Sequence, residues 1–89
     1  MTDAEKAATV LAALQAAGRA PADVALPMLN ELVGLVQAHN EAPLETEEAR
    51  ASAFMAICEI GKALHRGQPA ERLWAPAIAA TERWKSLAR

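Results

Sequence analysis

The segment 49–66 constrains the fold more than any other, because as a helix it has very little polar surface. At 3.6 residues per turn, small and apolar side chains fall along one line, and a narrow charged strip lies behind it. The line comprises Ala51, Phe54, Cys58, Gly61 and Leu64, with Ile57 and Ile60 beside it. The strip comprises Glu59, Lys62 and Arg66. We expect this helix to run unbroken from Glu45 to Arg66, to end at Gly67 and to be covered by other helices.

Another helix is expected at the start of the chain, where a capping signal precedes regular apolar spacing. Thr2 and Glu5 have the spacing of a capping box, so this helix should begin at Asp3. Gly18 should end it in the left-handed conformation. Its apolar stripe comprises Ala7, Val10, Leu11, Leu14 and Ala17.

Prolines set the expected starts of the two remaining helices. Pro21 should open a short turn, and Pro27 should take the first position of the main second helix, where its missing amide needs no partner. That helix should end near Asn40. The last helix should open at Gln68-Pro69 and either kink or restart at Pro76, because its apolar register continues through that residue.

The elements together predict an all-α protein. Residues that favour strands are scarce, with four Val, three Ile, one Phe and no Tyr, so we expect no sheet. Helices joined by short connections predict a small four-helix bundle made of two antiparallel helix hairpins. A chain of 89 residues is long enough for one domain, so residues 1–89 should form a single helical domain.

Alanine limits the size of the core. It supplies 23 of the residues in the apolar 53%, and it favours helices while adding little buried surface. Larger apolar side chains, with Met28, Phe54 and Met55 expected among those buried, must therefore provide most of the stabilisation. Stability should be modest, and association with a second copy would add to it, so a homodimer stays open.

The sequence favours a cytoplasmic protein that does not enter a membrane. Its single cysteine, Cys58, cannot form an internal disulfide, which suits a reducing compartment. The acidic Asp3 and Glu5 near the N-terminus are unlike the basic start of a signal peptide. The longest uncharged run, Ala7 to Gly18, is too short to span a bilayer.

No pattern in the sequence predicts catalysis, a metal or a cofactor. Cys58 and His65 share a helix face but lie about 10 Å apart, too far for a nucleophile and its base, so Cys58 is expected to be buried and inert. Neither His39 nor His65 has a potential metal ligand three or four residues away. The four glycines are scattered and form no phosphate-binding loop. We therefore expect a protein that is not an enzyme.

Charge is distributed unevenly along the chain. Residues 1–60 carry three basic and nine acidic side chains, a net charge of −6, whereas residues 61–89 carry six basic and two acidic, a net charge of +4. A DNA-binding regulator that uses the 61–89 hairpin as a helix-turn-helix is therefore one alternative. The overall charge of −2 and the pI near 5.6 argue against nucleic acid as the partner.

The leading hypothesis is a non-enzymatic protein–protein interaction module: a small adaptor, inhibitor or accessory subunit that binds another protein by surface complementarity. The two Trp residues are ten positions apart, so they cannot both occupy the centre of one helix face. Either one is a contact anchor or both lie at the edge of the core. The predicted contact residues are Glu59, Lys62 and Arg66 together with Arg72, Trp74, Trp84 and Lys85. A small-ligand bundle is a further alternative, and a groove holding His39 or His65 beside a Glu would favour it.

Overall fold

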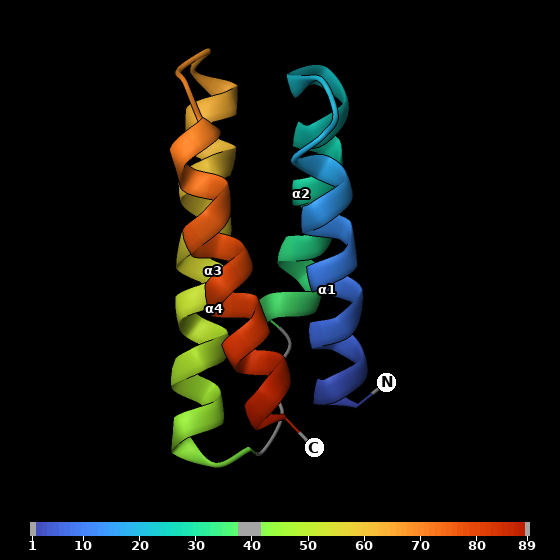
Figure 1. Cartoon of the computed structure of the whole chain (residues 1–89), viewed down its shortest axis with the longest axis vertical. Coiled ribbons are helices and arrows are strands. Elements are labelled where there is room, and N and C mark those ends of the chain that lie inside the picture. Colours follow the sequence, from blue (N-terminus) through green and yellow to red (C-terminus); the bar gives the residue numbers. More distant parts are fainter. Residues whose placement is uncertain (1, 38–41, 89) are drawn as a thin grey trace.

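The structure is a computed structural model that describes residues 2–37 and 42–88. Its helices are α1 (Asp3–Ala17), α2 (Ala22–Gln37), α3 (Leu44–His65) and α4 (Trp74–Leu87), and a 3₁₀ turn, η1 (Glu71–Leu73), precedes α4. Each α-helix contacts the two beside it, so that the order α1, α2, α3, α4 runs around the bundle and α4 returns to α1. Figure 1 shows two antiparallel hairpins, α1 with α2 and α3 with α4. The predicted all-α four-helix bundle is confirmed.

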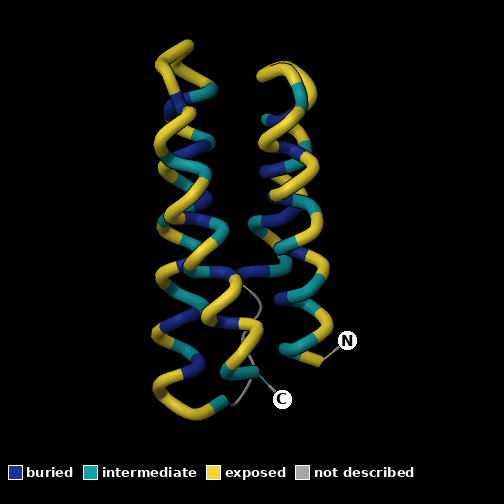
Figure 2. The backbone as a smooth tube through the Cα atoms, viewed as in Figure 1, coloured by how far each residue is buried: buried dark blue, intermediate teal, exposed yellow. Residues whose placement is uncertain are grey.

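The core occupies the axis of the bundle, where Figure 2 shows buried positions on all four helices. Its largest fully buried side chains are Trp84, Leu14, Leu29, Ile57 and Ile60. Half of the sixteen buried apolar residues described are alanines. Small side chains let neighbouring helices approach closely, and the few large ones fill the space that remains.

Helix α1 starts and ends where predicted, but the conformation of its C-cap, Gly18, differs from the prediction. The Glu5 amide donates to the Thr2 hydroxyl over 3.2 Å, and the Thr2 amide donates to the Glu5 carboxylate over 3.4 Å, which completes the capping box. Gly18 has φ −64°, so the predicted left-handed stop is wrong. A Cβ there would lie 3.4 Å from the Trp74 ring and 3.3 Å from the Leu14 carbonyl. Glycine at this position therefore permits close approach of α4.

The prediction that the second helix begins at Pro27 is also wrong. Helix α2 starts at Ala22, and the Pro21 carbonyl accepts hydrogen bonds from the amides of Val24 and Ala25. Pro27 lies inside the helix, just beyond its first turn. The amides of the first turn have no intrahelical partner, so a proline this close to the helix start forgoes only a single backbone hydrogen bond. A buried stripe crosses it without interruption: Ala25, Leu29, Leu32 and Val36. The predicted end near Asn40, and His39, lie outside the described residues.

Helix α3 is one unbroken coil within one residue of its predicted bounds. Gly67 ends it with φ +67°, as predicted, and the Gln68 amide donates to the Ala63 carbonyl over 2.8 Å. The buried line of α3 differs from the predicted one. All residues of the predicted line, including Phe54 and Cys58, are only half-buried. The residues that are buried instead are Thr46, Ala49, Ala53, Ile57, Ile60 and Ala63.

The last helix begins later than predicted. Residues 68–70 are not helical, η1 follows, and α4 starts at Trp74. The predicted short turn followed by a new helix is thus present, but the helix starts at Trp74, so Pro76 falls in its first turn and no kink forms there. The two Trp residues differ as their spacing requires: Trp84 is fully buried and Trp74 half-buried.

Candidate functional site

An open apolar groove runs between α2 and α3. Its volume is about 340 Å³. Helix α2 contributes Leu26, Leu29, Asn30 and Val33, and α3 contributes Ile57, Cys58, Gly61, Lys62 and His65. Leu29 and Ile57 are buried and form the floor, whereas Asn30, Lys62 and His65 are exposed. An apolar floor with polar groups at the edge is the usual composition of a binding groove.

Gly61 helps to create this groove. A Cβ built at Gly61 meets no atom within 4 Å, so the space beside the helix is open. A larger residue would project into the groove without displacing the backbone. Gly34 of α2 has equally open surroundings but does not line the groove. These two helical glycines therefore form a matched pair for testing the groove.

Cys58 in the groove is half-buried and free. The expectation of a buried, inert thiol is therefore wrong with respect to burial. The cause is the position of Cys58 on α3, one residue after the buried Ile57, which turns its side chain toward the gap between α2 and α3. The thiol is the one sulfur-containing side chain that lines this groove.

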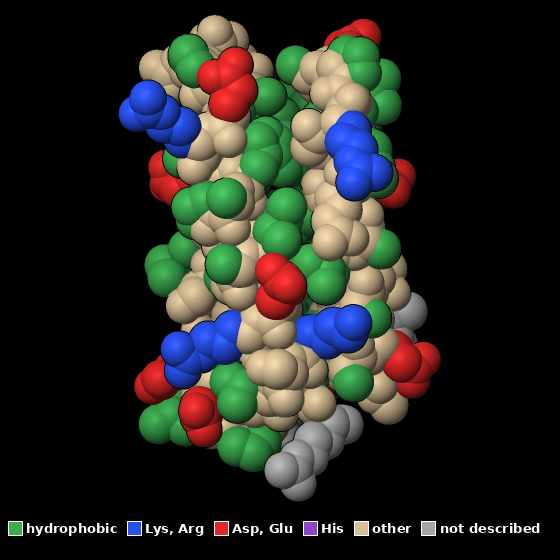
Figure 3. Space-filling view, viewed as in Figure 1, with side chains coloured by type: hydrophobic (Ala, Val, Ile, Leu, Met, Phe, Trp, Pro, Cys, Tyr) green, Lys and Arg blue, Asp and Glu red, His purple; other side chains and the backbone are tan. Residues whose placement is uncertain are grey.

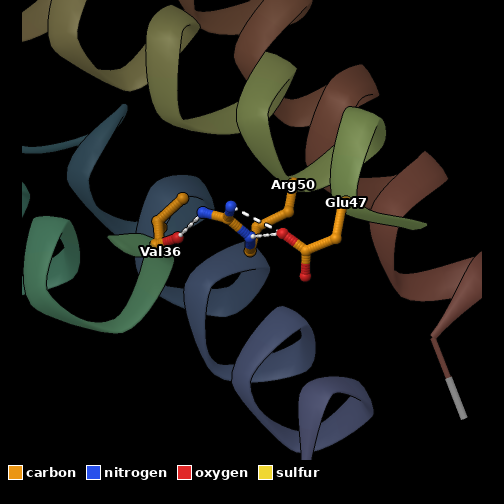
Figure 4. A network of polar contacts seen from close by, with 3 residues as sticks. All are labelled: Val36, Glu47 and Arg50. Carbon is orange, nitrogen blue, oxygen red and sulfur yellow. Dashed lines mark hydrogen bonds and ion pairs between the residues drawn. The ribbon is translucent and has the colours of Figure 1, made fainter. Parts of the chain in front are cut away.

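Beyond the groove, nearer the start of α3, a polar network ties α3 to the end of α2 (Figure 4). The Arg50 guanidinium donates through Nε and Nη2 to Oε2 of Glu47, over 2.9 and 2.7 Å. Its Nη1 donates to the Val36 carbonyl near the carboxyl end of α2. The two charged side chains are only 13% and 23% exposed. Arg50 thus fixes the relative position of α2 and α3, and with it the shape of the groove.

Of the predicted contact residues of α3, one lies at this side of the bundle, namely Lys62. Glu59, Lys62 and Arg66 are exposed, as expected. Lys62 also lines the groove, and its Nζ lies 3.4 Å from the carboxylate of Glu59. Both side chains of this pair are more than half exposed, so the pairing is weak and Lys62 can exchange its partner.

The predicted contact residues of α4 do not join this surface. Trp84 is fully buried, so it cannot contact a partner, and its indole N–H has no hydrogen-bond partner among the described residues. Trp74 packs beside Gly18 at the α1–α4 side, opposite the groove. Arg72 and Lys85 are exposed. The predicted surface therefore does not form as one patch, because the groove that Lys62 lines is completed by α2 and not by α4.

The α1–α4 face differs from the groove in character. In Figure 3, charged side chains of both signs are scattered over this face, and hydrophobic side chains follow the line between the two helices. A second cavity, of about 320 Å³, lies between α3 and α4 and has a more polar lining. It is lined by Glu48, Ala49, Ser52, Ala80 and Arg83. No His or Cys lines this cavity.

Clusters of metal-binding side chains are absent from the described part of the chain. No group of three or more His, Cys, Asp or Glu could hold a metal ion within residues 2–37 and 42–88. His65 lines the α2–α3 groove, but no carboxylate lines it beside this imidazole. The pairing that would have favoured a small-ligand or catalytic bundle is therefore missing there.

The 61–89 hairpin does not have helix-turn-helix geometry. Helices α3 and α4 lie side by side along their lengths and run antiparallel (Figure 1). A helix-turn-helix instead crosses its helices at a steep angle, which frees the second helix for the major groove. In α4, by contrast, Ala77, Thr81 and Trp84 are buried against the rest of the bundle.

No family model matches the chain, and no curated protein or solved structure is detectably similar to it. None of the helices that the structure describes is long and apolar enough to cross a membrane.

Proposed function

We propose that the chain is a non-enzymatic protein–protein interaction module, acting as a small adaptor, inhibitor or accessory subunit. Its contact surface would be the α2–α3 face, defined as the groove together with the outward side of α3. The observation that carries this proposal is an open apolar groove edged by Lys62 and His65. The free thiol of Cys58 fits a reducing compartment, and the proposal includes a cytoplasmic location.

The groove defines the chemistry of a suitable partner. Its apolar floor would accept aliphatic side chains from an amphipathic segment, which gain free energy when they leave water. Lys62 at the edge favours a carboxylate beside those side chains, because opposite charges steer and orient an encounter. The partner would thus present apolar and acidic residues on one helix face.

Two glycine substitutions provide the test. Gly61→Leu places an isobutyl group in the groove, whereas Gly34→Leu adds the same group outside its lining. Both replace a helical glycine by a good helix former, so both variants should fold. Tagged wild type and the two variants would each be used to capture proteins from the native host, followed by quantitative mass spectrometry.

We expect Gly61→Leu to lose the proteins that wild type and Gly34→Leu retain. Circular dichroism would confirm that all three proteins are equally helical. Equal recovery by wild type and Gly61→Leu would refute the groove as the contact surface. Loss with Gly34→Leu but not with Gly61→Leu would place the contact elsewhere on the bundle.

A further inference from the structure

Helix α3 carries a second regular pattern on its outward side. Residues spaced alternately four and three apart form one continuous stripe there, which we call the outer stripe. It comprises Leu44, Glu48, Ala51, Met55, Cys58, Lys62 and His65. This spacing is the heptad pattern by which one helix packs against another. Every residue of the outer stripe is exposed or half-buried, so none of the helices that the structure describes covers it completely.

The outer stripe exposes more apolar surface than an isolated bundle needs. Leu44 is 74% exposed and Met55 is 61% exposed, and they are two of the three large hydrophobic residues that the described chain leaves exposed. The expectation that Met55 belongs to the core is therefore wrong. Its position on α3 directs it away from the buried line through Ala53 and Ile57.

The order of residues in the outer stripe makes it complementary to itself. The half before Met55 contains an acidic residue, Glu48, and the half after it contains a basic one, Lys62. If a second α3 runs antiparallel with Met55 opposite Met55, then Glu48 falls opposite Lys62 of the second copy, and the reverse pair forms as well. In the same register Ala51 faces Cys58, and Leu44 faces His65, each with an offset of one residue along the helix.

We propose that a second copy of this chain occupies the outer stripe, forming an antiparallel α3–α3 dimer with its two-fold axis at Met55. This inference rests on the proposed function, because it names the partner of the α2–α3 face. The second copy offers the chemistry that the groove requires, namely a helix face that combines Leu44 and Ala51 with the carboxylate of Glu48 opposite Cys58, Lys62 and His65. Lys62 only has to leave its weak, exposed pairing with Glu59.

Other arrangements of the two helices are less favourable. A parallel pair would place Glu48 against Glu48 and Lys62 against Lys62, and both contacts are repulsive. Shifting the antiparallel pair by one heptad would place Met55 opposite Lys62 or Glu48 and would leave one end of the stripe uncovered. The register centred on Met55 is thus the one that pairs every position of the outer stripe.

Charge exchange tests the register directly. Sedimentation velocity would compare wild type, Glu48→Lys, Lys62→Glu and the double variant, from about 10 µM to 1 mM, because a contact made by one helix pair is at the small end of the interface range. Each single variant places like charges at both symmetric contacts, so its association constant should fall about tenfold or more. The double variant should recover association, and Glu31→Lys on α2 should not change it.

A thiol placed at the two-fold axis gives a second, independent readout. With Cys58→Ser removing the native thiol, Met55→Cys should form a disulfide dimer under mild oxidation, because the two residues meet at the axis. Ser52→Cys is the matched control, since two such residues would lie about 9 Å apart along the helices. Equal rates of cross-linking for the two variants would overturn the register.

A monomeric wild type across the whole concentration range would overturn the proposed dimer, as would a double variant that fails to recover association. Neither result would affect the capture experiment, in which loss of a partner with Gly61→Leu tests the proposed function separately. Circular dichroism of each variant would check that the fold is retained. We expect the fold to be retained, because Glu48 and Lys62 are exposed.

Discussion

Replacing Arg50 with alanine should destabilise the fold far more than replacing a surface arginine. The substitution removes both bonds to the Glu47 carboxylate and the bond to the Val36 carbonyl. Fully exposed ion pairs contribute up to about 1 kcal/mol, whereas breaking a buried pair costs about 3–5 kcal/mol. With side chains 13% and 23% exposed, the pair lies between these limits. We expect Arg50→Ala to lower the free energy of unfolding by about 2 kcal/mol.

Urea unfolding followed by circular dichroism would measure this loss, with an unchanged slope showing that the unfolded state is the same. The control is Arg83→Ala, which removes an ion pair 3.9 Å long whose side chains are both 67% exposed. That variant should cost less than about 0.5 kcal/mol. The double variant Glu47→Ala/Arg50→Ala should cost less than the sum of the two single variants, because they share one interaction. An Arg50→Ala protein as stable as Arg83→Ala would refute the structural role assigned to this network.

Further substitutions test other features of the fold. Gly34→Ala should raise the free energy of unfolding by about 0.5–1 kcal/mol in urea, because alanine favours the helix interior and meets open space there. Gly67→Ala should instead lower it by about 1 kcal/mol, because the residue would have to keep φ +67°. Trp84→Ala should cost about 3–5 kcal/mol in the same assay, since it empties the largest buried site. Cys58 should react with a thiol reagent in the absence of denaturant, at a rate that does not follow global unfolding, because the thiol is half-exposed.

Local signals in the sequence predicted helix boundaries where a cap defines them. Thr2 with Glu5 marked the start of α1, and Gly67 marked the end of α3, because both depend on the conformation of a few adjacent residues. The prediction that a helix begins at Pro27 was wrong. Proline inside α2 loses one local hydrogen bond, but the apolar stripe that continues through it is buried in the tertiary fold, and this burial stabilises the longer helix by more. Tertiary packing decided that boundary.

The direction in which α3 faces could not be predicted from hydrophobicity. Alanine occurs on several sides of this helix, so the apolar pattern gives no single inward direction. Ala49 and Ala53 are buried because neighbouring helices approach closely there, and this depends on the complete bundle. Because α3 faces the core along this line of alanines, Cys58 and Lys62 lie at the groove and Met55 lies at the surface.

The candidate site could be predicted only in part for the same reason. Glu59, Lys62 and Arg66 were predicted as exposed residues of α3, since charged side chains seldom lie in a core. The α2 wall of the groove, with Leu26 and Val33, consists of ordinary apolar residues that carry no signal of their own. Their role follows only from the gap left beside Gly61.

The most direct measurement of the central claim, that the α2–α3 face binds protein and first of all a second copy, is a concentration series of amide NMR spectra of the labelled chain. We predict that the amide shifts change with concentration along the outer stripe of α3 and in the adjoining groove, whereas those of α1 and α4 stay constant. Shifts that do not depend on concentration, or that change chiefly on α1 and α4, would contradict the account.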